Sequence, residues 1–158
     1  MKKFDITVPV EALQYDELTA QEKHLVDVAR EYTSHAYAPY SHFNVGAAIA
    51  LDNGEVVPGA NQENAAFPSG TCAERSACYA AGARFPGVKF TEIAIAARGT
   101  DGLELPTPVA PCGACRQALL EYETLAGRPV PVLLVGRDAI YRLPSVASLL
   151  PLAFSQID

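Results

Sequence analysis

The chain contains no run of basic residues. Its 12 lysine and arginine residues are scattered among 18 acidic residues, and the net charge is −6. A protein that binds a phosphate backbone needs clustered positive charge. We therefore expect no nucleic-acid partner, and a small neutral substrate fits this composition better.

Long apolar runs are also absent. The longest segment without a charged residue or histidine, residues 143–157, is shorter than a membrane span and contains Pro144 and Pro151. Asp5 stands where the apolar part of a secretory signal would begin. These absences favour a cytoplasmic protein with no membrane partner. Cysteines there stay reduced, and Cys-x-x-Cys more often indicates metal or redox chemistry than a disulfide.

Internal repeats and low-complexity linkers are missing as well. A chain of 158 residues is long enough for one domain with a real core and too short for two comfortable ones. Residues 1–20 show weak patterning, so we interpret them as an N-terminal extension that precedes a single domain at 21–158.

The spacing of apolar residues predicts alternating helices and strands. Helices are predicted at 19–35, 71–84 and 112–122, with a short one at 145–150. Strands are predicted at 43–51, 55–57, 90–98 and 130–135, the first two forming a hairpin around Asp52-Asn53-Gly54. This order predicts an α/β fold in which helices cover a mixed sheet in three layers.

Four residues in two short stretches suggest metal chemistry: Cys72 and Glu74, then Cys112 and Cys115. The cysteines fall in the first turns of two predicted helices, where N–H groups favour thiolates and positions three apart share a face. Three thiolates fill three corners of a zinc tetrahedron and leave the fourth for water, as in catalytic sites. Glu74 is then placed to move protons beside that water, and Arg75 to donate hydrogen bonds to the sulfurs.

Each of these motifs has a structural alternative. Thr71 and Glu74 have the spacing of a capping box, in which the carboxylate bonds the helix start instead of moving protons. Cys-x-x-Cys alone is also typical of a redox pair or of half a structural zinc site. A structural site needs a fourth ligand, but Cys78 falls on another part of the helix surface, and we interpret it as a buried apolar residue. No ligand spacing is found among the three histidines, His24, His35 and His42.

Taken in order, the motifs resemble those of the small zinc-dependent cytidine deaminases that have three cysteine ligands. The resemblance extends over about residues 34–154 and includes the blocks 36–48, 59–65, 72–75 and 111–117. It implies a three-layer α/β/α cytidine deaminase-like fold with a mixed five-stranded sheet, one Zn²⁺ per subunit and a homotetramer. It also implies hydrolytic deamination of cytidine and 2′-deoxycytidine in pyrimidine salvage, with Glu74 as the proton carrier.

The resemblance further implies a set of substrate contacts. Phe43 is expected to pack against the pyrimidine ring, and Asn61 and Glu63 to bind the ribose hydroxyls. The carbonyl of Ala73 is expected to accept from the amino group of the base. Phe154 is expected to reach the pocket of a neighbouring subunit. Without the other blocks, Asn61 and Glu63 would instead be interpreted as turn residues.

Two departures from the family pattern and three alternative functions stay open. Phe67 stands where many members carry a tyrosine, and the loop at 99–110 is longer than usual. A nucleic-acid base deaminase usually has histidine as its first ligand and a basic surface, unlike this chain. A deaminase of another cytosine nucleoside, such as a nucleoside antibiotic, would share the zinc site. A zinc-stabilised binding module would bind the metal without turnover.

Overall fold

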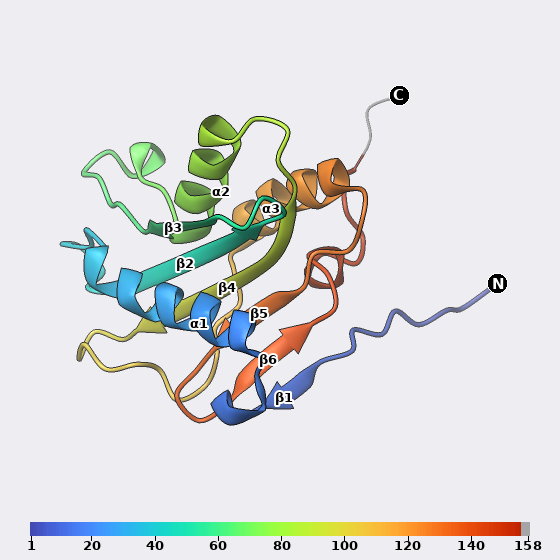
Figure 1. Cartoon of the computed structure of the whole chain (residues 1–158), viewed down its shortest axis with the longest axis horizontal. Coiled ribbons are helices and arrows are strands. Elements are labelled where there is room, and N and C mark those ends of the chain that lie inside the picture. The colour runs from blue at the N-terminus through green and yellow to red at the C-terminus, as the bar shows by residue number, and fades with distance from the viewer. Residues whose placement is uncertain (156–158) are drawn as a thin grey trace.

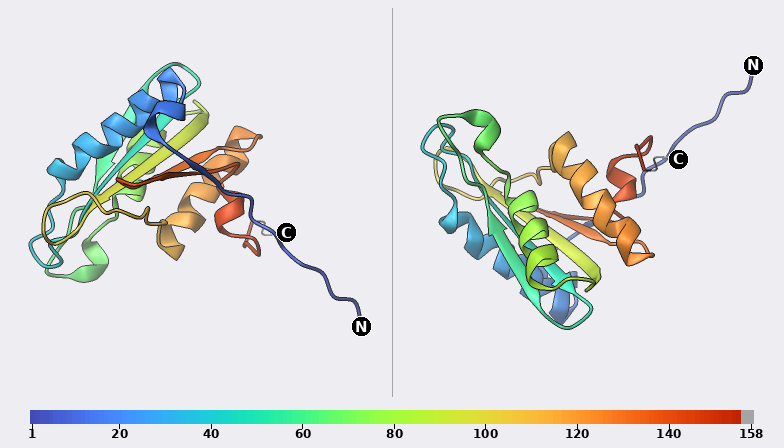
Figure 2. Two further views of the ribbon diagram at one scale, coloured as in Figure 1. Left: turned by 90° about the horizontal axis from the view of Figure 1, so that it is seen from below. Right: turned by 90° about the horizontal axis from the view of Figure 1, so that it is seen from above.

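One mixed sheet separates two layers of helices in the computed structural model, which describes residues 1–155 (Figures 1 and 2). Helix α1 (Ala20–Tyr32) covers one face of the sheet. Helices α2 (Ala73–Arg84) and α3 (Gly113–Ala126) cover the other. The three-layer α/β arrangement expected from the sequence is confirmed.

Within residues 1–155 the sheet has six strands, where five were expected. Their spatial order is β1 (Glu11–Leu13), β6 (Ile140–Leu143), β5 (Val132–Val135), β4 (Phe90–Arg98), β2 (Asn44–Leu51) and β3 (Val56–Ala60). Strands β4 and β5 are parallel, and all the other neighbours are antiparallel. The three residues of β1 carry no alternating pattern, and the strand is held instead by pairing with β6. Local sequence therefore gave no signal for this edge.

Each face of the sheet packs against its own apolar cluster. Leu25, Val26 and Ala29 of α1 are fully buried against β2, β4 and β5. On the opposite face, buried residues of α2 and α3 pack against the same strands, and they include Cys78 and Leu119. Cys78 is thus an ordinary buried residue, as interpreted from its position in the sequence.

Two glycines bring the helices unusually close to the hairpin of β2 and β3. A Cβ on Gly46 would lie 2.1 Å from the carbonyl oxygen of Ala29 in α1. A Cβ on Gly59 would lie 2.5 Å from the backbone nitrogen of Ala77 in α2. Real Cβ atoms do not approach backbone this closely, so only glycine fits. The contact at Gly59 fixes where α2 begins relative to the sheet.

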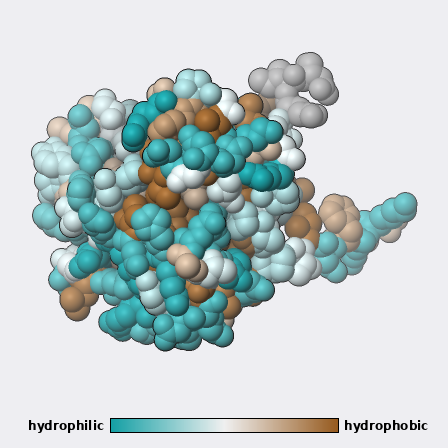
Figure 3. Space-filling model, viewed as in Figure 1, coloured by the Kyte–Doolittle hydropathy of each residue, from teal (hydrophilic) through white to brown (hydrophobic). Residues whose placement is uncertain are grey.

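The first ten residues project from the body of the protein as an extended arm (Figures 1 and 3). Phe4, Ile6, Val8 and Val10 alternate along this arm and are all exposed. Within residues 1–155, no helix combines the length and apolar character needed to span a bilayer.

Candidate metal centre and substrate cleft

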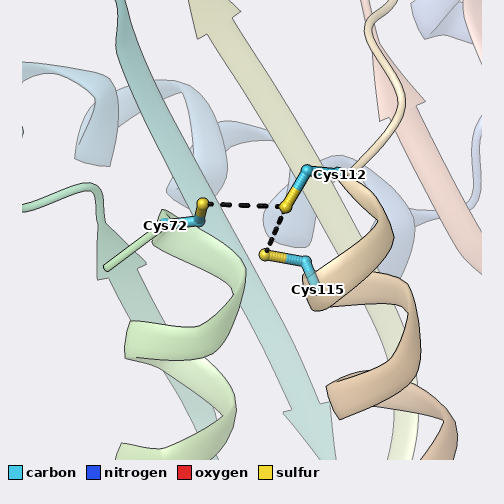
Figure 4. A group of neighbouring side chains, drawn as sticks. All are labelled: Cys72, Cys112 and Cys115. Atoms are coloured by element: carbon cyan, nitrogen blue, oxygen red, sulfur yellow. Dashed lines mark hydrogen bonds between the residues drawn. The ribbon is translucent and has the colours of Figure 1, made fainter. Parts of the chain in front are cut away.

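Three thiols from two helix starts converge on one point. Cys72 precedes α2, Cys112 precedes α3, and Cys115 lies in the first turn of α3; their side chains point toward one another (Figure 4). The Cys72 and Cys112 sulfurs are 3.9 Å apart, and the Cys112 and Cys115 sulfurs 3.5 Å apart. All three sulfurs lie within 4.8 Å of one another.

These separations fit a zinc ion better than a disulfide. Zn–S bonds of about 2.3 Å in a tetrahedron place neighbouring sulfurs roughly 3.8 Å apart. A disulfide would bring two sulfurs to about 2.05 Å, and all four cysteines are free thiols. The donor set and its spacing therefore fit zinc with one coordination position left over.

The starts of α2 and α3 are not capped by side chains. Cys72 and Cys112 occupy the N-cap positions, and neither makes a side-chain capping hydrogen bond. The Thr71 hydroxyl lies 3.4 Å from the Cys72 carbonyl oxygen, with no capping contact to α2. The capping-box alternative for Thr71 and Glu74 is therefore wrong, since the N-cap is one residue later. No side chain caps the first N–H groups of either helix, and the partial positive charge of these helix starts favours thiolates nearby.

Glu74 is a buried carboxyl group next to the thiols. It is 4% exposed, and burial raises its pKa above the usual value, with the nearby Cys72 thiolate adding to the rise. A carboxyl group with a raised pKa can both accept and return a proton near neutral pH. It lies in the first turn of α2, and the backbone of this helix packs closely on Gly59 of β3.

Arg75 supplies positive charge to the sulfur cluster. Its Nη2 lies 3.7 Å from the Cys72 sulfur. The pKa of the Cys72 thiol is lowered, first by the hydrogen bond from Cys115 and then, against the effect of burial, by Arg75. The pKa of Cys115 is raised, first by its hydrogen bond with Cys72 and then by burial.

A cavity of about 310 Å³ opens beside the thiols and Glu74. Its lining residues come from five separate segments of the chain: Ser41, Phe43, Val45, Asn61, Glu63, Cys72, Glu74, Ile95, Val109, Ala110 and Cys112. A hollow of about 500 Å³ shares Ser41, Asn61, Glu63 and Cys72 with it and extends outward past Phe67 and Arg75. The structure thus brings Phe43, Asn61 and Glu63 to the pocket that contains Glu74.

Asn61 and Glu63 are held rigidly at the mouth of this cavity. The Asn61 side chain accepts from the Val45 N–H at 2.7 Å and donates to the Phe43 carbonyl at 2.9 Å. Glu63 accepts from the Ser41 hydroxyl and from the Tyr40 N–H, the latter at 2.9 Å. The Ser41 hydroxyl contributes most to lowering the Glu63 pKa, so this carboxylate stays ionised.

Comparison with known proteins identifies the family. Residues 19–126, more than half of the chain, match the model of the cytidine and deoxycytidylate deaminase zinc-binding region. The chain belongs to this deaminase family. A cytidine deaminase of Sporosarcina psychrophila is 38% identical over 135 residues, covering 85% of this chain and 91% of the relative.

Solved structures of deaminases have the same fold. The crystal structure of cytidine deaminase from Burkholderia pseudomallei matches with a TM-score of 0.70 and 38% identity, covering 87% of this chain and 100% of that one. The enzyme from Mycobacterium tuberculosis matches with a TM-score of 0.67 and 31% identity, again over 87% and 100%.

Two of the predicted substrate contacts, Ala73 and Phe154, are not among the residues that line this cavity. Ala73 is fully buried, and its carbonyl oxygen faces β3, where a Cβ on Gly59 would lie 2.6 Å away. Phe154 is 66% exposed, and its carbonyl accepts from Gln117 of α3 at 2.8 Å. The tail is therefore tied to α3 by its backbone, while its aromatic ring points to solvent.

Several lining residues gave no distinct signal in the sequence. Ile95 is one apolar residue within a buried strand, and Val109 and Ala110 lie in a proline-rich loop. Ser41 belongs to a recognisable block, but its role in holding Glu63 depends on a contact between residues 22 apart. Only the folded arrangement shows that these residues share a cavity.

Proposed function

We propose that this protein is a cytoplasmic enzyme of pyrimidine salvage that hydrolyses cytidine and 2′-deoxycytidine to uridine and 2′-deoxyuridine. The observation that carries the proposal is the buried Glu74 carboxyl group beside three converging thiols in a cavity of about 310 Å³. Membership of the deaminase family supports the reaction class, and the names of the relatives support cytidine as a substrate.

Cys72, Cys112 and Cys115 would hold one Zn²⁺ per subunit. Zinc in such a site lowers the pKa of a coordinated water toward neutrality. Arg75 would donate to the Cys72 sulfur and reduce the excess negative charge of three thiolates. The partial positive charge at the starts of α2 and α3 acts in the same direction.

Glu74 would carry the protons of the reaction. It takes one proton from the attacking water as the oxygen bonds to C4 of the cytosine ring, and it delivers that proton to N3. A second proton then passes through the same carboxyl group to the amino nitrogen, and the C4–N bond breaks to release ammonia. Water and cytidine thus yield uridine and ammonia in balance. The raised pKa of Glu74 suits both directions of transfer.

The remaining predicted contacts would orient the nucleoside. Phe43 packs on the ring, while Asn61 and Glu63, already fixed by backbone and Ser41 contacts, bind the ribose hydroxyls. The carbonyl of Ala73, the residue directly before Glu74, accepts from the amino group of the base in this proposal, and Ala73 itself packs against β3. Because the Phe154 ring is exposed, it is available to a neighbouring subunit of the proposed homotetramer.

The test is an ammonia-release and absorbance assay on zinc-loaded protein, with Glu74→Gln as the matched variant. We expect turnover of both nucleosides by the wild type. The variant should retain zinc and lose at least about 10³-fold in kcat, because the amide cannot accept the proton. Comparable rates for the two proteins would contradict the proton-carrier role. If the protein binds zinc but releases ammonia only from a cytosine nucleoside antibiotic, it is a deaminase of that other nucleoside. If it binds zinc and releases ammonia from none of these compounds, it is a zinc-stabilised binding module.

A further inference from the structure

The long loop between β4 and α3 is held in place along most of its length (Figure 1). Its first turn closes on itself, since the Gly99 N–H donates to the Leu103 carbonyl at 2.9 Å. Arg30 of α1 then forms a half-buried ion pair with Glu104, with Nε and Oε1 2.8 Å apart. The beginning of the loop is therefore anchored to a helix on the far face of the sheet.

The middle of the loop lies between two other segments and is hydrogen-bonded to both. The Leu105 N–H donates to the Ala97 carbonyl of β4 at 3.2 Å. On the other side, the Arg137 N–H donates to the Leu105 carbonyl at 2.8 Å, and the Asp138 N–H to the Pro106 carbonyl at 3.1 Å. The turn between β5 and β6 thus forms a fixed support for this part of the loop.

Gly136, at the start of that turn, makes the closest contact with the loop. A Cβ there would lie 2.7 Å from the Pro108 backbone nitrogen and 2.8 Å from the Pro106 carbonyl oxygen. Both atoms belong to backbone, so no flexible side chain could move aside. Residue 136 must therefore lack a side chain for the loop to occupy this position.

The loop continues from this contact directly into the cavity wall. Pro106, Pro108 and Pro111 have fixed φ angles and restrict the residues between them. Val109 and Ala110, immediately after Pro108, line the cavity together with Glu74 and Cys112. A displacement at residues 106–108 is therefore passed on to the surface that faces the base.

We propose that Gly136, which lies outside the cavity, is a positioning residue that sets the place of the Val109–Ala110 wall and so the affinity for the pyrimidine. The inference rests on the proposed function, because it assumes that this cavity binds a nucleoside. It concerns the shape of the pocket rather than the proton transfers. Changes at residue 136 should therefore affect the binding of substrate and transition state equally.

The experiment compares Gly136→Ala with the wild type in the zinc-loaded protein. We expect the KM for cytidine to rise about fivefold to tenfold while kcat changes less than about twofold. The dissociation constant of the product uridine, measured by calorimetry, should rise by the same factor. Zinc content should stay at the wild-type value. Pro111, with its fixed φ angle, separates the Val109–Ala110 wall from Cys112, and Cys72 and Cys115 lie outside the loop.

Two control variants separate positioning from general destabilisation. Arg137→Ala removes an exposed side chain from the same turn and keeps the backbone hydrogen bond to Leu105. Gly82→Ala introduces a milder crowding in α2, against the Tyr122 side chain, whose hydroxyl would lie 2.7 Å away, and it lies away from the cavity. Both should leave KM and uridine affinity unchanged, even if Gly82→Ala lowers the melting temperature.

A Gly136→Ala protein with wild-type KM and uridine affinity would overturn the inference, and so would equal losses in the Gly82→Ala control. If Gly136→Ala does not fold, Glu104→Gln provides the second test. This variant weakens the ion pair between the loop and Arg30, so it should raise the KM for cytidine by a smaller factor. An unchanged KM in Glu104→Gln would equally overturn the inference. Failure of the wild type to turn over cytidine would instead contradict the proposed function.

Discussion

The start of α1 and the starts of α2 and α3 are built differently, although all three helices pack on the same sheet. Thr19 and Glu22 close the start of α1 with a reciprocal capping box, at 3.2 and 2.7 Å. Cys72 and Cys112 occupy the equivalent positions of α2 and α3 and cap nothing. A closed helix start stabilises the fold, whereas an open one keeps partial positive charge that favours thiolates, and the thiolates can then bind a cation.

The largest effect should come from removing a thiol at one of the two uncapped helix starts, those of α2 and α3. Cys112→Ser removes one of the three sulfurs from an exposed position, so little packing is lost. We expect zinc content well below one ion per chain and a loss of turnover beyond about 10³-fold, because the acidified water is lost. Elemental analysis and the ammonia assay measure both. Wild-type zinc content in this variant would show that Cys112 is not a ligand.

Removing the cap of α1 should have the opposite outcome, a loss of stability without a loss of activity. Thr19→Ala removes the capping hydroxyl and should lower the free energy of unfolding by about 1 kcal/mol, with kcat/KM unchanged within about twofold. Thr71→Ala is the matched change before α2, where no cap exists, and it should alter the unfolding free energy by less than about 0.3 kcal/mol. Urea unfolding and kinetics of both variants provide the measurement. An equal loss of stability at the two sites would remove the distinction between them.

The smallest effect concerns a charged group near the start of α1. Burial raises the pKa of Glu92 to about 7, and the neighbouring Glu22 adds to the rise, whereas Arg142 opposes it. Arg142 is itself paired with Glu22 at 2.6 Å and with Glu11 at 2.9 Å. The folded state therefore retains a proton on Glu92 that the unfolded chain has lost, and this carboxyl group makes the protein less stable as pH rises from about 4.5 to about 7.

Glu92→Gln should remove that pH dependence. We expect the variant to be more stable than the wild type at pH 8 by roughly 1 kcal/mol after allowance for solvent screening, and nearly equal to it at pH 5. Urea unfolding at the two pH values tests this, and turnover should not change. A variant that is less stable at pH 8 would show that the Glu92 carboxylate is stabilised in the fold.

The sequence was informative where spacing along one segment decided the outcome. The spacing of Cys112 and Cys115 on one helix face predicted that these two thiols converge, and the match to the zinc-deaminase motif added Cys72 and Glu74. Thr71 and Glu74 left a capping box open as an alternative, because the same spacing occurs in a real capping box at Thr19 and Glu22. Whether such a pair caps a helix depends on where the helix begins, and α2 begins one residue later than the capping box requires.

Features that depend on contacts between distant segments could not be predicted. Strand β1 exists because β6 offers a free edge, and its residues Glu11–Leu13 carry no pattern of their own. The length of the loop before Cys112 was evident from the sequence, but its support by Gly136 was not, since these segments meet only in the fold. The direction of the Ala73 carbonyl likewise follows from how α2 packs on β3.

X-ray absorption spectroscopy at the zinc edge of the purified protein tests most directly whether Cys72, Cys112 and Cys115 leave one coordination position open. The expected spectrum has three sulfur neighbours at about 2.3 Å and one oxygen or nitrogen neighbour at about 2.0 Å. Four sulfur neighbours would indicate a closed structural site, and protein purified without zinc that cannot be loaded would show that the three thiols hold no such ion.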